Sequence, residues 1–190
     1  MFQINPKQNS SVLGVFSFTV SILDMDPGFG VWLKENYSEF NKFLISTVTQ
    51  YKDPDLIKNF TNLQSKIMIY DELIFLESAE YEEIISVLLE SLLTINEYAM
   101  TKEILLFFNS FMGLPKGINH PKVLKILPDL IKSLIYLLPD INRNFLIYEI
   151  HVLQALVKSY GKGNNELYVF IRGSLNDAKF VDLTEKQKVS

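Results

Sequence analysis

Residues 40–70 read FNKFLISTVTQYKDPDLIKNFTNLQSKIMIY. Apolar residues recur there at spacings of three and four on both sides of a short polar turn, the spacing that places side chains on one face of an α-helix. The first stripe begins earlier in the chain and consists of Trp32, Phe40, Phe43, Leu44, Val48 and Tyr51. We therefore predict helices over 31–51 and 55–70, the second with an ambiguous extension toward residue 76. In the turn, Asp53 suits a helix N-cap and Pro54 a first helical position. The stretch therefore predicts two consecutive helices joined by a tight turn.

The same pair of helices recurs along the chain. The first helix of each pair starts near residues 36, 80, 121 and 165, at intervals of about 44, 41 and 44 residues. Further stripes at helical spacing consist of Tyr81, Ile84, Leu88, Leu92 and Ile95, of Ile104, Leu105, Phe108 and Met112, and of Val123, Leu127, Ile131 and Leu134. One helix pair cannot bury its own apolar face and stacks on the next, so a period of about 40–47 residues indicates a helical-repeat array.

Two motifs within these pairs resemble those of HEAT and armadillo repeat proteins. Residues 52–58, KDPDLIK, are similar to the HEAT inter-helix turn, in which an Asp-Pro pair precedes an apolar and a basic residue. Residues 127–134, LPDLIKSL, are similar to a HEAT first helix, which often carries an internal proline, here Pro128. The second helices are bulkier than those of the family, and the pair over 81–112 lacks an Asp-Pro turn. HEAT, armadillo and a looser superhelix therefore stay open as alternatives.

The resemblance covers about residues 36–177 and implies an all-α fold. The implied architecture is a right-handed superhelical stack of antiparallel helix pairs, with about seven to eight helices. A partner of such a stack binds along the surface formed by the second helices, here 55–70, 101–113 and 143–160. The individual residues that contact the partner are unknown at this level.

The predicted array accounts for most of the chain. We predict an N-terminal segment at 1–30 that packs on the array or leads into it, the helical-repeat domain at 31–183, and a flexible tail at 184–190. The tail is polar, and chain ends of this kind tend to fray.

The N-terminal segment differs in pattern from the rest. Alternation over 16–22 is typical of a strand, whereas Ser10 and Ser11 could equally cap a helix that runs to Leu23. We favour the helix because everything downstream is helical. The sequence DPGFG at 26–30 predicts a firm break, an acidic turn that caps the helix over 31–51.

Composition and charge argue against several classes of function. The formal net charge is −4, the pI is about 5.3, and the arginines are Arg143 and Arg172 alone. Nucleic-acid binders usually carry clustered basic residues, Arg in particular, so we predict no nucleic-acid partner. The chain has no cysteine, which excludes disulfides and thiolate catalysis. Apolar residues make up 48%, so either most helices are covered on more than one face or part of the surface binds a partner.

The uncharged run Gln8–Leu23 is the candidate for a membrane or targeting segment. It is shorter than the ~20 residues that a transmembrane helix needs. It also lacks the basic n-region and the small-residue cleavage site of a signal peptide. We therefore predict no membrane span and a soluble intracellular protein, either cytoplasmic or nuclear.

No motif in the sequence indicates a catalytic or metal site. The histidines are His120 and His151, and neither lies in an HExxH pattern, so we predict no metal site. Asp24 and Asp26 precede a glycine turn but lack the other residues of a phosphate or calcium loop. The sequence GKGNN at 161–165 follows a helix, so its amide groups point the wrong way for a phosphate. We predict no catalytic residue, no cofactor and no enzyme activity.

Two further stretches have both a structural and a functional interpretation. Glu80, Glu82 and Glu83 fall in the first turn of a predicted helix, where negative charge offsets the helix dipole, and we interpret them as solvated. Residues 104–115 hold no charge. An inner helix covered on both sides is the favoured interpretation of 104–115, and a hydrophobic groove for a partner helix is the alternative.

The leading hypothesis for function is a non-catalytic scaffold or adaptor that binds a protein or peptide along its groove. The alternative is a helical enzyme or small-molecule carrier with a buried pocket, for which Tyr148, Glu149 and His151, adjacent on one helix, are the candidate polar groups. A third hypothesis is that the chain is one segment of a longer array or a larger complex, in which case the isolated chain self-associates.

Overall fold

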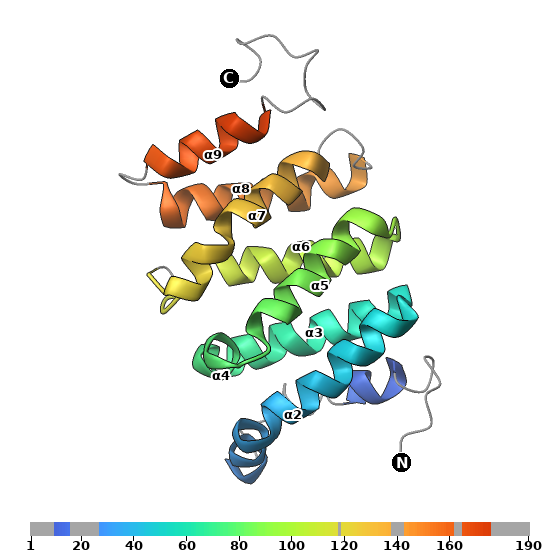
Figure 1. The fold of residues 1–190 in the computed structure, drawn as a ribbon. Helices are drawn as coiled ribbons and strands as arrows, with labels where there is room; N and C mark the ends of the chain where they lie inside the picture. The colour runs from blue at the N-terminus through green and yellow to red at the C-terminus, as the bar shows by residue number, and fades with distance from the viewer. Residues whose placement is uncertain (1–9, 16–26, 118, 138–142, 162–164, 176–190) are drawn as a thin grey trace.

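The computed structural model consists of helices throughout its described part, which confirms the prediction of an all-α fold (Figure 1). It describes residues 10–15, 27–117, 119–137, 143–161 and 165–175. Residues 10–15 form a short helical segment. The helices that follow are α2 (Pro27–Tyr51), α3 (Pro54–Tyr70), α4 (Glu72–Glu77), α5 (Tyr81–Thr94), α6 (Tyr98–Met112), α7 (Pro121–Leu137), α8 (Arg143–Tyr160) and α9 (Asn165–Leu175).

The longer helices lie in two layers (Figure 1). One layer contains α2, α5, α7 and α9 in that order, and the other contains α3, α6 and α8. Within the first layer, α5 contacts α2 and α7, and α7 contacts α9. Within the second layer, α6 contacts both α3 and α8. The stack therefore grows from α2 toward α9 as the chain proceeds.

Polar contacts between neighbouring helices of a layer recur at a similar sequence separation. Ser38 Oγ donates to Glu80 Oε1 at 2.7 Å and joins α2 to the residue that precedes α5. Matching contacts join α3 to α6, α5 to α7 and α6 to α8, namely Asn62 to Glu103, Lys125 to Glu82 and Ser159 to the Met112 carbonyl oxygen. The four pairs are 42, 41, 43 and 47 residues apart in sequence. These separations are close to the predicted intervals between helix pairs.

The turn between α2 and α3 forms as its residues predict. Asp53 is the N-cap of α3, its Oδ1 accepts the Leu56 N–H at 2.9 Å, and Pro54 opens the helix. Lys52 has a φ of 47°, a left-handed conformation that often ends a helix. The predicted N-cap and first-position proline are confirmed.

The predicted break at 26–30 is wrong for residues 27–30, which form the first turn of α2. Proline fits there because an N–H in the first turn has no helical acceptor. Gly30 is buried, and a side chain at this position would meet the Tyr70 hydroxyl. The glycine therefore lets α2 pass close to the C-terminal end of α3.

One ambiguous helix end is resolved, and one helix start differs from the prediction. α3 stops at Tyr70, the end of the predicted range, and the ambiguous extension is a separate short helix, α4, whose N-cap, Asp71, accepts the Leu73 N–H at 3.0 Å. α6 begins at Tyr98 rather than near residue 101, because Glu97 is its N-cap and accepts the Met100 N–H at 2.7 Å. In both places an acidic side chain satisfies an N–H that has no acceptor within the helix.

The predicted N-terminal segment and tail are described only in part. Residues 10–15 are helical, in line with the helix predicted from Ser10. The remainder of that predicted helix, the alternative strand, and the tail at 184–190 lie outside the described residues. Across the described part of the chain, no helix is long and apolar enough to cross a membrane.

Aromatic rings form the centre of the stack. Phe75 packs edge-on against Phe107 and Phe111, with ring centroids 5.7 and 6.3 Å apart. Phe107 also packs edge-on against Phe108 at 5.3 Å, and all four side chains are fully buried. The three phenylalanines of the charge-free stretch 104–115 are thus core residues, which confirms the favoured interpretation over an open groove.

Candidate interaction groove

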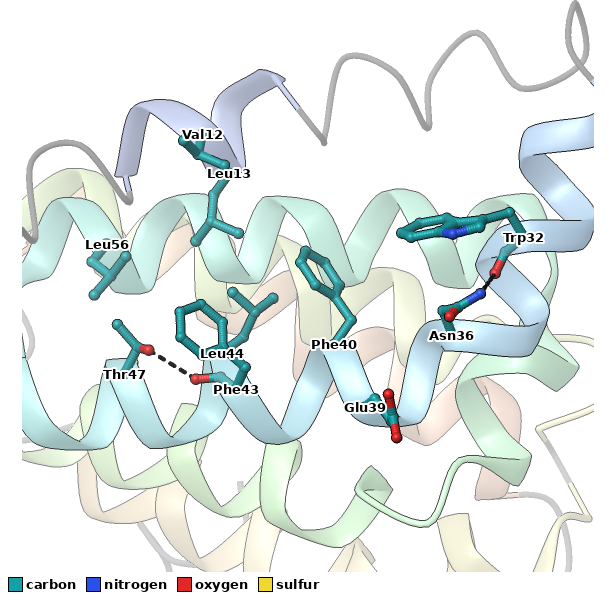
Figure 2. A pocket seen from close by; sticks show the side chains of 10 residues that line it. All are labelled: Val12, Leu13, Trp32, Asn36, Glu39, Phe40, Phe43, Leu44, Thr47 and Leu56. Atoms are coloured by element: carbon teal, nitrogen blue, oxygen red, sulfur yellow. Dashed lines mark hydrogen bonds between the residues drawn. The ribbon is translucent and has the colours of Figure 1, made fainter. Parts of the chain in front are cut away.

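An apolar groove lies where the segment 10–15 meets α2 and α3 (Figure 2). Its volume is about 330 Å³. We call it the α2 groove, and it is lined by Val12, Leu13, Trp32, Asn36, Glu39, Phe40, Phe43, Leu44, Thr47 and Leu56. Seven of these ten residues are apolar or aromatic, so the groove offers mainly hydrocarbon and ring surface.

One flank of α2 supplies most of the groove. Trp32, Phe40 and Phe43 recur at helical spacing on this flank, and Trp32 and Phe43 are 41% and 36% exposed. The opposite flank of α2 faces α5, where Ser38 and Lys42 contact Glu80. The groove is therefore on the side of α2 that points away from the rest of its layer.

The segment 10–15 closes the far side of the groove. Leu13 is fully buried and points from this segment toward α2 (Figure 2). Asn59 Nδ2 on α3 donates to the Ser10 carbonyl oxygen at 3.1 Å and to Ser10 Oγ at 2.6 Å. One apolar anchor and two hydrogen bonds thus fix the segment on α3.

The two uncharged polar side chains of the groove lining, Asn36 and Thr47, are bonded to their own helix. Asn36 Nδ2 donates to the Trp32 carbonyl oxygen, and Thr47 Oγ1 donates to the Phe43 carbonyl oxygen, both at 2.8 Å (Figure 2). These intrahelical bonds use the polar donors that would otherwise fix the orientation of a polar ligand. The groove is consequently suited to apolar groups.

The rim of the groove is acidic. Glu39 is the charged member of the ten lining residues, and Glu35 lies one turn earlier on α2. Both carboxylates are exposed, and neither forms an ion pair with a described residue. A partner that fits this rim would carry a basic group beside its apolar surface.

A buried hydrogen-bonded chain holds α2 against α3 below the groove. Tyr37 Oη donates to Gln64 Oε1 at 2.5 Å, and Gln64 Nε2 donates to Asn41 Oδ1 at 2.8 Å. All three side chains are buried, and burial raises the pKa of Tyr37 far above its usual value. The two side-chain hydrogen bonds join α2 to α3 beneath the groove, and Asn41 Nδ2 has no acceptor among the described residues.

Glu80 joins α2 to the start of α5 by hydrogen bonds, and the prediction that this residue is solvated is wrong. The residue is 3% exposed and accepts from Ser38 Oγ at 2.7 Å and from Ser78 Oγ at 2.9 Å. Burial alone would raise the pKa of this carboxyl, but the two hydroxyl donors and Lys42 outweigh burial and lower it. Glu82 and Glu83 are exposed, as predicted.

The polar residues suggested for a buried pocket differ widely in their exposure. Glu149 is fully buried, Tyr148 is half-buried with Lys102 Nζ 5.4 Å above its ring, and His151 is exposed. His120 is half-buried and lies at the start of α7, remote in the sequence from these three. The structure therefore gives no support to a polar pocket built from Tyr148, Glu149 and His151.

Metal and phosphate sites find no support in the described residues either. Nowhere in this part of the chain do three or more His, Asp or Glu side chains gather as metal ligands would. Asp24 and Asp26, and the centre of the GKGNN stretch at 162–164, lie outside it.

Sequence reasoning missed the α2 groove although it found the residues that form it. Trp32, Phe40 and Phe43 were assigned to the stripe that carries the core. The structure divides that stripe, with Leu44 and Val48 buried and Trp32 and Phe43 half-exposed. The available signal was the width of the apolar face of α2, which exceeds what one neighbouring helix covers.

Comparisons with protein-family models, with curated proteins and with solved structures give no match to this chain.

Proposed function

We propose that this chain is a non-catalytic interaction module that binds an apolar, basic segment of a partner protein in the α2 groove. In this proposal the two layers are a right-handed superhelical stack of HEAT or armadillo type. The partner segment lies against Trp32 and Phe43, and its basic residue pairs with Glu39. The binding surface then differs from the predicted one, because it involves a first-layer helix and only the edge of α3.

The repeat architecture is supported by the order of the helices and by the spacing of their contacts. Neighbours in each layer are joined by polar contacts 41 to 47 residues apart in sequence. A stack of equivalent helix pairs produces such contacts because each pair touches only the pairs beside it.

The half-exposed aromatic flank of α2 is the observation that carries the proposed binding. Large aromatic side chains at the edge of a hollow are the residues that contribute most to protein–protein binding. The groove sits on helices fixed by the buried chain from Tyr37 to Asn41, so little ordering is needed when a partner binds. A short helix with apolar residues on one face and Lys or Arg beside them fits this surface.

A small-molecule carrier is the second candidate function, and the size of the groove favours it. The volume of about 330 Å³ falls at the lower end of small-molecule pockets. Against this candidate, the polar donors of Asn36 and Thr47 are bonded within α2 and do not point at a ligand. An apolar fluorescent probe separates the two candidates if its displacement is measured with peptides and with lipids.

A displayed library of helical peptides tests the proposal. The library varies apolar and charged positions independently and is selected on the whole chain, with Phe43→Lys as the counter-selection protein. We expect enriched peptides with an apolar face and flanking Lys or Arg, and at least a tenfold loss of affinity for Phe43→Lys. Ile69→Lys is the matched control, because Ile69 is 68% exposed on α3 and does not line the groove. Peptides that bind Phe43→Lys as tightly as the wild type, or that are acidic, would contradict the proposal.

A further inference from the structure

We propose that copies of this chain associate head to tail, with an apolar stripe on α8 of one copy seated in the α2 groove of the next. The stripe consists of Leu146, Ile150, Leu153 and Val157, and we call it the α8 stripe. The inference rests on the proposed function because it uses the same groove, and it names a second copy of the chain as one natural occupant.

The α8 stripe lies on the flank of α8 that faces away from α6. Its residues follow one another at spacings of four, three and four, which places them on one side of the helix. Leu146, Ile150 and Val157 are between 37% and 42% exposed. On the opposite side of the helix, Ser159 Oγ donates to the Met112 carbonyl oxygen of α6 at 2.7 Å, and Tyr148 lies below Lys102 of α6. The stripe is therefore at the far end of the second layer, where a stack would continue.

The α2 groove occupies the corresponding place at the other end of the stack. α6 packs against α3 within the second layer, and Asn59 of α3 contacts Ser10 in the segment 10–15. The segment and the groove beside it thus lie on the side of α3 and α2 from which the stack starts (Figure 1). Docking the end of one copy on the start of another would continue the stack from copy to copy, with α8 meeting α2 and the segment 10–15 of the next copy.

Opposite charges border the two surfaces. Glu39 lines the groove and is exposed, and Lys42 of the same helix contacts Glu80 at 3.7 Å. The α8 stripe is bordered by exposed Lys158, and the only carboxylate of α8, Glu149, is buried. Pairing two α8 stripes would bring like charges together, whereas pairing stripe with groove brings opposite charges together. The charges therefore favour the head-to-tail arrangement over a symmetric dimer.

A contact between two different surfaces does not by itself stop at a dimer. Each added copy leaves one free groove and one free stripe, so association continues until concentration limits it unless the geometry closes a ring. The mean mass should therefore rise with concentration instead of stopping at a dimer, and it should fall with added salt, which screens the bordering charges.

Sedimentation velocity on the full chain with two variants tests this inference. Phe43→Lys blocks the groove and leaves the stripe intact, and Ile150→Glu blocks the stripe and leaves the groove intact. We expect each variant alone to be monomeric at concentrations where the wild type associates. An equimolar mixture should form dimers and nothing larger, because only one productive contact is available. Circular dichroism and the thermal midpoint of each variant confirm that it is folded, and Ile69→Lys should associate like the wild type.

A charge exchange provides a second measurement that does not disturb apolar packing. Glu39 and Lys158 are both exposed, so Glu39→Lys and Lys158→Glu should fold normally. Each should weaken association severalfold, and the double variant should recover most of the loss.

Three results would overturn the inference. The first is a wild type that stays monomeric at every concentration. The second is a mixture of the two variants that forms no dimer. The third is a dimer that Phe43→Lys still forms and Ile150→Glu does not, because this result would show that two α8 stripes pair with each other. If the wild type is monomeric but still binds library peptides in the groove, the proposed function stands and only self-association fails. If the wild type associates but binds no library peptide, self-association stands and the proposed function fails.

Discussion

Two helices of the second layer, α6 and α8, have a similar apolar content but differ in how many neighbouring helices cover them. α6 lies between α3 and α8, and its Phe107, Phe108 and Phe111 are fully buried. α8 has α6 on one side, and on the other its stripe is exposed. The difference shows that an apolar helix face is core or surface according to its place in the stack, which its own sequence does not record.

The carboxylates of the two helices also differ in burial and in hydrogen bonding. On α6, Glu103 is half-buried and accepts from Asn62 Nδ2 at 2.9 Å. On α8, Glu149 is 0% exposed, and no group in the described part of the chain donates a hydrogen bond to either of its oxygens. Burial raises the pKa of Glu149 from 4.5 to about 7. The end helix thus carries a carboxyl group whose ionisation, at a pH above about 7, opposes folding.

The largest effect should come from the covered helix. Phe107→Ala removes a ring that contacts Phe75, Phe108 and Phe111. We expect a loss of about 3–5 kcal/mol in the free energy of unfolding, from lost burial and the cavity left behind. Urea denaturation measures it, with the half-exposed neighbour Leu106→Ala as the control, for which we expect about 1 kcal/mol or less. Equal losses at both positions would mean that α6 is not the covered helix.

Removing the buried charge on α8 should give the next largest effect. The folded chain keeps the Glu149 proton between pH 4.5 and about 7, whereas the unfolded chain releases it, so stability from this group falls as pH rises across that range. Glu149→Gln should therefore stabilise the protein by on the order of 2 kcal/mol above pH 7 and change little near pH 4.

Thermal unfolding of wild type and Glu149→Gln across pH measures this gain. Glu103→Gln on α6 is the matched control, and it should show no comparable gain because Glu103 is hydrogen-bonded and half-buried. A Glu149→Gln variant less stable than the wild type at pH 8 would indicate a hidden partner for the carboxylate.

The cap that starts α6 should contribute less. Glu97→Ala leaves the Met100 N–H without its acceptor, and loss of an N-cap side chain costs about 1 kcal/mol. Glu97→Asp retains a carboxylate at the cap and should restore most of this stability in the same urea titration. If Glu97→Ala unfolds like the wild type, the start of α6 is fixed by packing instead of by its cap.

The smallest effect should be at the exposed flank of α8. Val157→Ser, measured on dilute monomer, should change the free energy of unfolding by no more than about 0.5 kcal/mol, because Val157 is half-exposed. A loss above about 1.5 kcal/mol would mean that the chain itself covers the α8 stripe, and head-to-tail association would then lack its surface.

The sequence was sufficient to predict the helices and the turns that carry a clear chemical signal. Asp53 and Pro54 define the start of α3, and the stripes of α5, α6 and α7 lie on buried faces. The start of α2 was predicted wrongly, because Gly30 could be placed inside α2 only by knowing that Tyr70 lies beside it.

The candidate site was less predictable than the fold. The stripe from Trp32 to Val48 follows one period, and nothing local marks Phe43 as surface and Leu44 as core. Glu80 looked solvated because its hydrogen-bond donor, Ser38, lies 42 residues earlier in the chain. In both cases the deciding contact comes from another helix pair, so it depends on how the pairs stack.

An amide NMR titration of the monomeric Ile150→Glu variant, whose groove is intact, with a selected basic, apolar peptide tests the central claim most directly. We predict that the shifted resonances come from the segment 10–15 and from the groove side of α2, including the Trp32 indole, with little change in α6 or α8. Shifts that map instead to the outer surface of α3, α6 and α8, or that persist unchanged in Phe43→Lys, would contradict the α2 groove as the binding surface.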